Sequence, residues 1–152
     1  MVLTSMASRL QLVDDGSGRP PADQFVDGLV RDWTAWADAG VDVYAIADAP
    51  LNGEVRSPDC VALNVEDPLA CARPRAEAQP PDPLVIAAAQ INRPEVKVID
   101  LTPNFCDERL CYAVIGGEPV YYDADHLNLR YTRMLAPQID RLIPQGSTAA
   151  GG

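Results

Sequence analysis

The alternation of apolar and polar positions along the chain predicts strands separated by helices. Three short runs rich in β-branched and aromatic residues are typical of buried strands, at about 2–6, 41–47 and 95–101. From Asp23 to Ala39 apolar side chains recur at helical spacing, and Gly40 follows where a helix C-cap would lie. A shorter helix is expected at about 82–92. This alternation predicts an α/β fold with three layers, in which helices cover both faces of a mainly parallel open sheet.

The second half of the chain predicts a hairpin followed by a closing helix. The stretch "YAVIGGEPVYYD" has the pattern of a hairpin around Gly116 and Gly117, and "HLNLRYTRMLAPQIDRLI" predicts a final helix over 126–143. Residues 144–152 are small and polar, so we expect a disordered tail. We therefore predict one domain over 1–143 that carries a long Pro-rich insertion at about 51–83.

The net charge of the chain argues against nucleic acid as a partner. The 152 residues carry a formal net charge of −10, which would repel the phosphate backbone of a nucleic acid. No apolar run reaches the length of a bilayer span, and the first residues lack the pattern of a secretory signal. The chain opens directly on an apolar run without a preceding turn, so we expect the domain to be incomplete at its N-terminus.

The four cysteines fall into two local couples, with spacings that do not match a zinc knuckle or a Cys-x-x-Cys redox motif. Four cysteines allow three disulfide connectivities, and short-range closure favours Cys60 with Cys71 and Cys106 with Cys111. Four reduced thiols in the core are the alternative. Oxidised cysteines would place the domain in a periplasm, at a cell surface or outside the cell.

The only histidine of the chain, His126, follows Asp123 by three positions in "YYDADHLN". An Asp-x-x-His pair at the start of a helix can place a carboxylate against one imidazole nitrogen, as a Ser-His-Asp triad requires. The simpler interpretation is that Asp123 or Asp125 caps the last helix and that His126 is a residue of its first turn. A metal site at Asp123, Asp125 and His126 is a third interpretation, although further ligands are hard to find.

The segment "VIDLTPNFCDERLCYAVIGGEPVYYDADHLNLRYTRMLAPQI" resembles the SGNH-hydrolase-like domain fused to acyltransferase-3 family membrane proteins. Less specific similarity extends to "VYAIADAP" and "SPDC", so that the resemblance covers most of 41–143. It implies an SGNH/flavodoxin-like sheet and O-acylation of cell-surface glycans and glycolipids. Asp123 and His126 match the last two members of the family triad. Asn128 stands where a serine is common in the family.

The nucleophile of the family lies in a Gly-Asp-Ser motif after the first strand, and this chain has no such motif. Ser5 and Ser8 lie on or just after the first predicted strand, but this strand corresponds to a later strand of the family and not to the nucleophile turn. The family glycine and asparagine of the oxyanion hole are not identifiable either. Asp48 and Asn52, after the second predicted strand, are possible pocket residues, although a loop-capping role is the commoner one for an Asp before Pro.

The sequence therefore leaves two functions open. In the first, the chain is the C-terminal part of an SGNH-like domain that transfers acetyl groups to cell-surface glycans or hydrolyses them from these glycans. It contributes the Asp and His of a triad whose serine lies upstream, so that the isolated chain is inactive. Its partners would be an acylated or acceptor carbohydrate and a membrane acyltransferase domain, and its location extracytoplasmic, without a cofactor. In the second, the chain is a non-catalytic remnant or a partner-binding fragment of the same fold.

Overall fold

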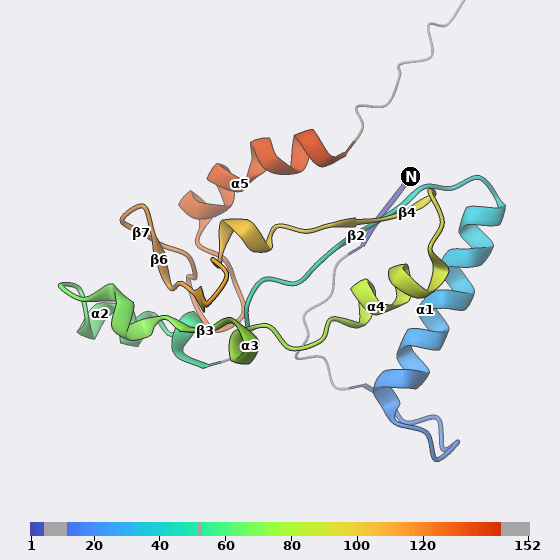
Figure 1. Cartoon of the computed structure of the whole chain (residues 1–152), viewed down its shortest axis with the longest axis horizontal. Coiled ribbons are helices and arrows are strands. Elements are labelled where there is room, and N and C mark those ends of the chain that lie inside the picture. Colours follow the sequence, from blue (N-terminus) through green and yellow to red (C-terminus); the bar gives the residue numbers. More distant parts are fainter. Residues whose placement is uncertain (5–11, 52, 144–152) are drawn as a thin grey trace, which may run out of the picture.

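The computed structural model describes residues 1–4, 12–51 and 53–143, and Figure 1 shows their arrangement. Three strands form one parallel sheet in the order β1 (Val2–Thr4), β2 (Val43–Ile46) and β4 (Val96–Ile99). Val43 of the central strand pairs with Val2 on one side and with Val96 on the other. The three predicted strands are therefore present and parallel, although positions 5 and 6 of the first lie outside the described residues.

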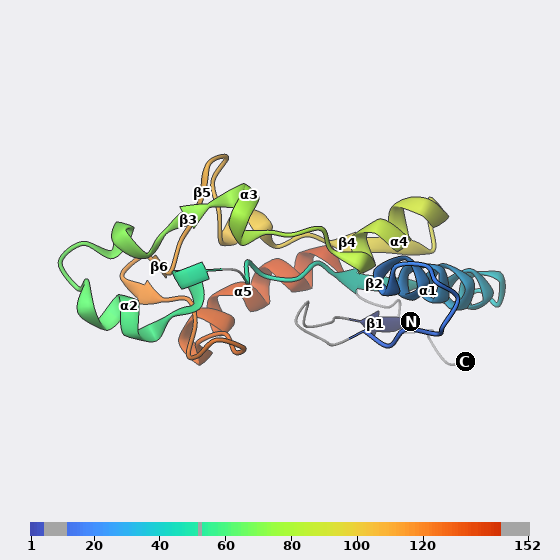
Figure 2. The same ribbon diagram turned by 90° about the horizontal axis from the view of Figure 1, so that it is seen from below.

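Two helices pack together on one face of this sheet, α1 (Pro21–Asp38) and α4 (Pro83–Ile91) (Figures 1 and 2). Trp33 is the largest side chain of the core that they form, and it is only 2% exposed. The other members of this core are all apolar: Val26, Ala37, Val43, Ala45, Leu84, Ala87, Ala88 and Val96. Both helices lie within a few residues of the predicted bounds.

The last helix, α5 (Leu129–Leu142), packs on a second core that contains Tyr44 of β2 and Ile99 of β4. Val43 and Ala45 belong to the first core and Tyr44 to the second, because successive side chains of a strand point to opposite faces. Helices therefore cover both faces, and the predicted three-layer α/β fold is confirmed.

The insertion, which the sequence predicted only as a long Pro-rich segment, is folded into short elements. These elements are η1 (Gly53–Arg56), α2 (Pro58–Leu63), η2 (Pro68–Cys71), β3 (Arg73–Pro74) and α3 (Arg75–Ala78). β3 pairs antiparallel with β5 (Leu110–Cys111), which follows β4 and the short turn η3 (Thr102–Asn104). The structure contains both predicted disulfides, Cys60–Cys71 within the insertion and Cys106–Cys111 beside β5.

The predicted hairpin is formed by β6 (Val114–Ile115) and β7 (Glu118–Pro119). Its turn residues Gly116 and Gly117 have φ values of 61° and 81°, a conformation that a two-residue hairpin turn requires and that glycine adopts without strain. The predicted tail at 144–152 lies outside the described residues. None of the described helices combines the length and the apolar character needed to cross a bilayer.

Candidate active site

The Asp-x-x-His element forms a closed loop between β7 and α5, which we call the DADH loop (residues 121–128). Tyr121 and Leu127 form an antiparallel bridge at its base. The Tyr122 amide donates to the carbonyl of His126 at 2.9 Å, and the Asn128 amide donates to the carbonyl of Val120 at 2.9 Å. Backbone hydrogen bonds therefore fix both ends of the loop and hold Asp123 and His126 at its tip.

The carboxylate of Asp123 organises the tip of the loop. Its Oδ1 accepts hydrogen bonds from the backbone amides of Asp125 and His126, both at 2.8 Å. The imidazole Nδ1 of His126 lies 2.9 Å from each carboxylate oxygen. A carboxylate can only accept hydrogen bonds, so Nδ1 carries a proton and Nε2 of a neutral imidazole is left as the basic nitrogen. This is the tautomer that a Ser-His-Asp triad uses.

The same hydrogen bonds keep Asp123 ionised. The Asp125 amide, and after it the His126 imidazole, lower the pKa of Asp123 below its ordinary value of 3.8. The side chains remain accessible to solvent, with 74% of His126 and 44% of Asp123 exposed. Among the described residues, the imidazole is therefore largely open to solvent.

The structure corrects the expected start of the last helix. Asn128 is the N-cap, because its side chain accepts a hydrogen bond from the Arg130 amide at 2.9 Å, and α5 begins at Leu129. His126 therefore lies in a loop before the helix, and the interpretation of it as a residue of the first helical turn is wrong. Asp125 does not cap the helix either, since its side chain lines a cavity on the sheet side of the loop.

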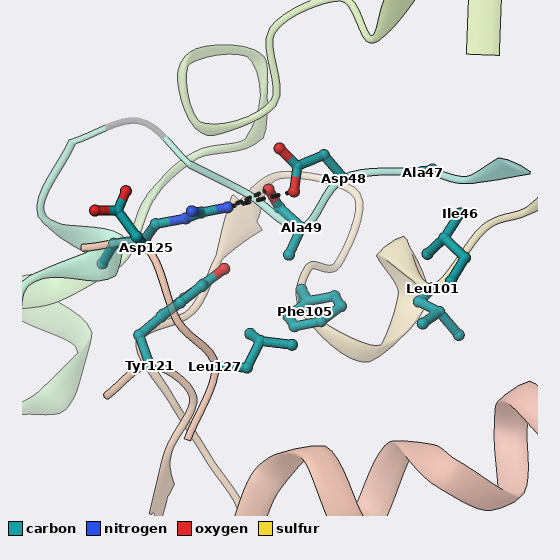
Figure 3. A pocket seen from close by; sticks show the side chains of 10 residues that line it. Ile46, Ala47, Asp48, Ala49, Leu101, Phe105, Tyr121, Asp125 and Leu127 are labelled. Atoms are coloured by element: carbon teal, nitrogen blue, oxygen red, sulfur yellow. Dashed lines mark hydrogen bonds and ion pairs between the residues drawn. The ribbon is translucent and has the colours of Figure 1, made fainter. Parts of the chain in front are cut away.

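This cavity, of about 280 Å³, lies at the carboxyl ends of β2 and β4, where ligands of open α/β sheets bind. Figure 3 shows the carboxylates of Asp48 and Asp125 along one side, with Phe105 and Leu127 across from them. Its apolar lining joins the second core, and its polar lining comes from the strand end and from the DADH loop. The predicted pocket residue Asp48 is thus beside the loop that bears His126.

Arg56 connects the end of β2 to the DADH loop, and its side chain is buried, with only 7% of the residue exposed. Its guanidinium donates to the carbonyls of Pro50 (Nε, 2.6 Å), Ala49 (Nη2, 2.9 Å) and Ala124 (Nη1, 3.2 Å). An oxygen of the Asp48 carboxylate lies 3.6 Å from Nη2. One buried cation therefore holds three residues after β2 and one residue of the DADH loop in a fixed relation.

Tyr121 packs under this cation and completes the connection. The guanidinium carbon of Arg56 lies 5.2 Å from the centre of the Tyr121 ring, and the Tyr121 hydroxyl donates to the carbonyl of Pro50 at 2.8 Å. Burial raises the pKa of Tyr121, so its hydroxyl remains a hydrogen-bond donor. The base of the DADH loop is therefore anchored by a side chain as well as by backbone.

Sequence reasoning did not find Arg56 or Tyr121. The partners of Arg56 are mostly backbone carbonyls, which carry no signature in the residue types, and an arginine in a Pro-rich insertion is ordinarily exposed. The other predicted residues, Asn52 together with Ser5 and Ser8, lie outside the described residues. Within the described part of the chain, no group of three or more His, Cys, Asp and Glu side chains is placed to bind a metal ion.

Comparison with known proteins identifies the family. The family described as SGNH domain (fused to AT3 domains) matches residues 3–141, which is most of the chain. No curated protein and no solved structure gives a significant match. The match spans the parallel sheet, the insertion and the DADH loop, and the chain therefore belongs to the family of SGNH domains that are fused to acyltransferase-3 domains.

Proposed function

We propose that the chain contributes the Asp and His of a Ser-His-Asp acyl-transfer site, with the serine provided by polypeptide outside residues 1–152. The observation that carries this proposal is the contact of His126 Nδ1 with both oxygens of Asp123 at 2.9 Å, in a loop that leaves the imidazole open to solvent. Membership of the SGNH family adds support, because acyl transfer and hydrolysis are the chemistry of these domains.

In the proposed reaction, Nε2 of His126 removes the proton of the serine hydroxyl as its oxygen attacks the carbonyl carbon of an acyl donor. The imidazolium then returns this proton to the leaving oxygen of the donor as the carbon–oxygen bond of the donor breaks. The same two steps, with the hydroxyl of an acceptor sugar or with water as the nucleophile, release the acyl group from the serine. Asp123 remains ionised throughout, because its hydrogen bonds lower its pKa, and it keeps the imidazole in the reactive orientation.

We infer a cell-surface glycan as the acceptor and a membrane-embedded acyltransferase domain as the partner, since the family is defined by its fusion to AT3 domains. Two disulfides favour an oxidising compartment, and this supports an extracytoplasmic location. β1 is an outer strand of the described sheet, so a serine-bearing strand has a position at which to pair. No cofactor enters these steps.

A non-catalytic role of the same fold is the second candidate. The sequence has no Gly-Asp-Ser motif, and a base without a nucleophile or oxyanion donors gives little rate enhancement. In this case the DADH loop would be a structural remnant, and the loss of His126 would change neither turnover nor binding of the full-length polypeptide.

The two candidates are separated by measuring acetyl transfer from an activated acetyl ester with the full-length polypeptide that contains this chain. We expect turnover in the full-length polypeptide and almost none with residues 1–152 alone. His126→Ala should lower kcat of the full-length polypeptide by about 10³-fold or more. Arg133→Ala on the exposed surface of α5 is the matched control, and it should leave kcat unchanged. Equal turnover of wild type and His126→Ala would reject the acyl-transfer proposal.

A further inference from the structure

A second hollow of about 530 Å³ lies beside the DADH loop, and we call it the apolar groove. One wall comes from α2 and the segment that follows it, with Val61 and Val65 among the lining residues. The other wall comes from the β6–β7 hairpin and from the ends of the DADH loop, with Val114, Tyr122 and Asn128. Figures 1 and 2 both place α2 beside this hairpin. None of the described residues that line the groove carries a charged side chain.

The wall formed by α2 is fixed to the rest of the insertion by a disulfide and by a helix cap. The disulfide Cys60–Cys71 ties α2 to η2, and the Ser57 hydroxyl caps α2 by accepting a hydrogen bond from the Cys60 amide at 3.1 Å. Around the groove, apolar side chains stay in contact with water, since Val65 is 69% exposed and Tyr122 is 72% exposed. A fixed apolar hollow of this size is in the range of small-molecule sites, which is about 300–1,000 Å³.

The groove and the catalytic pair share the same loop. Tyr122 lines the groove, and its amide donates to the carbonyl of His126 at 2.9 Å. Asn128 lines the groove two residues after His126, and its amide closes the other end of the loop on Val120. A group that lies in the groove is therefore next to the segment that carries the imidazole.

We propose, on the basis of the proposed function, that the apolar groove binds the alkyl chain of an acyl group longer than acetyl. An uncharged chain without hydrogen-bonding groups matches a wall of Val, Pro and Ala side chains, because its burial removes apolar surface from water. A sugar does not match the wall formed by α2 and the segment after it, because the Pro, Val and Ala side chains there offer its hydroxyls no hydrogen-bond partner. The groove therefore selects the acyl group, and the glycan binds elsewhere on the domain.

This proposal is tested by binding, without any catalytic step. Methyl esters of unbranched acids from acetate to hexanoate are titrated into ¹⁵N-labelled chain, and the amide shifts of Val61, Val65 and Tyr122 are followed. We expect these amides to shift with the longer esters. The affinity should increase by about three- to fourfold per added methylene, the factor that the burial of one methylene gives.

Two variants and one control locate the binding to the groove. Val61→Asp puts a charge into the wall and should lower the affinity for methyl hexanoate at least tenfold. Tyr122→Ala should lower this affinity several-fold. Tyr122 is largely exposed, so its replacement does not endanger folding. Leu63→Asp adds the same charge to α2 at a residue that is 85% exposed and does not line the groove, and it should leave the affinity unchanged.

Three results would overturn the proposal. The first is equal binding of methyl acetate and methyl hexanoate, and the second is equal binding by Val61→Asp and Leu63→Asp. The third is a dimer of the ligand-free chain, seen by sedimentation, that Val61→Asp alone dissociates, because a second copy would then occupy the groove. These results leave the proposed function untouched. That function instead fails if His126→Ala of the full-length polypeptide keeps its turnover, whatever the groove binds.

Discussion

The two cores of the molecule, on opposite faces of the sheet, are held together by different interactions. The core under α1 and α4 consists of apolar side chains alone, on regular helices and strands. The core under α5 extends into the insertion and the DADH loop. Around it, the disulfide of the insertion, the disulfide beside β5, the buried Arg56 and the turn around Asp123 add to the packing. The first core makes a scaffold, and the second fixes irregular segments in the positions that a site requires.

The largest loss of stability is expected from a substitution in the core under α1 and α4. Trp33→Ala removes a side chain that is 2% exposed and should lower the free energy of unfolding by about 3–5 kcal/mol. Trp36→Ala on the same helix, where the side chain is 40% exposed, should cost about 1 kcal/mol or less. Urea unfolding followed by circular dichroism measures both. Similar losses for the two variants would contradict the position of Trp33 in the core.

The next largest loss of stability is expected from a change that affects the insertion and leaves the core under α1 and α4 intact. Replacing Cys60 and Cys71 together by Ser opens a cross-link between residues 11 positions apart, which should lower the free energy of unfolding by about 2–3 kcal/mol. Hydrogen exchange should then accelerate more in α2, which can open locally once the cross-link is gone, than in α1, whose core contacts are all retained. Uniform loss of protection in α1 and α2 would mean that the two cores do not differ in this way.

A somewhat smaller effect is expected at Arg56. Arg56→Met leaves the carbonyls of Ala49 and Ala124 without their donor and should cost about 1–3 kcal/mol. Arg130→Met breaks an exposed ion pair with Glu118 at 3.0 Å and should cost less than about 1 kcal/mol. Thermal unfolding compares the two variants. If both changed the melting temperature equally, the buried cation would not be the link between β2 and the DADH loop.

The smallest effect concerns the titration of Asp123. Its pKa is lowered in the folded chain, so its contribution to stability is present above the ordinary value of 3.8 and is lost as the pH falls through the lower folded value. We expect the ¹³C carboxyl shift of Asp123 to have a midpoint below 3.8, and His126→Ala to raise this midpoint. The midpoint should change little in Asp125→Asn, because the amide that bonds Asp123 is retained. An unchanged midpoint in His126→Ala would mean that the imidazole does not bond this carboxylate in solution.

The scaffold core could be predicted from the sequence because its elements follow simple periodicities. The spacing that places Trp33 and Ala37 on one face of α1 also predicts the helix, and Gly116 and Gly117 predict the hairpin turn. The cysteine spacing indicated the two couples that form the disulfides. In each case the information lies in residues that are close together in the chain.

The site could be predicted only in part, because its contacts join distant segments. The Asp-x-x-His spacing predicted that Asp123 and His126 can contact each other, as they do, but it did not predict the loop in which they lie. Asp123, Asp125 and Asn128 are all good helix caps, so the sequence alone could not choose among them. Arg56 reaches across 68 positions to a backbone carbonyl at Ala124, and no pattern of residue types predicts such a contact.

The most direct test of the central claim is a double-mutant cycle on acyl transfer by the full-length polypeptide, with His126→Ala, Asp123→Ala and the double variant. If Asp123 acts through His126, each single variant should lower kcat steeply, and the double variant should be no slower than His126→Ala alone. This result would show that the two residues form one catalytic unit. Losses that multiply in the double variant, or a His126→Ala variant with wild-type kcat, would contradict the account.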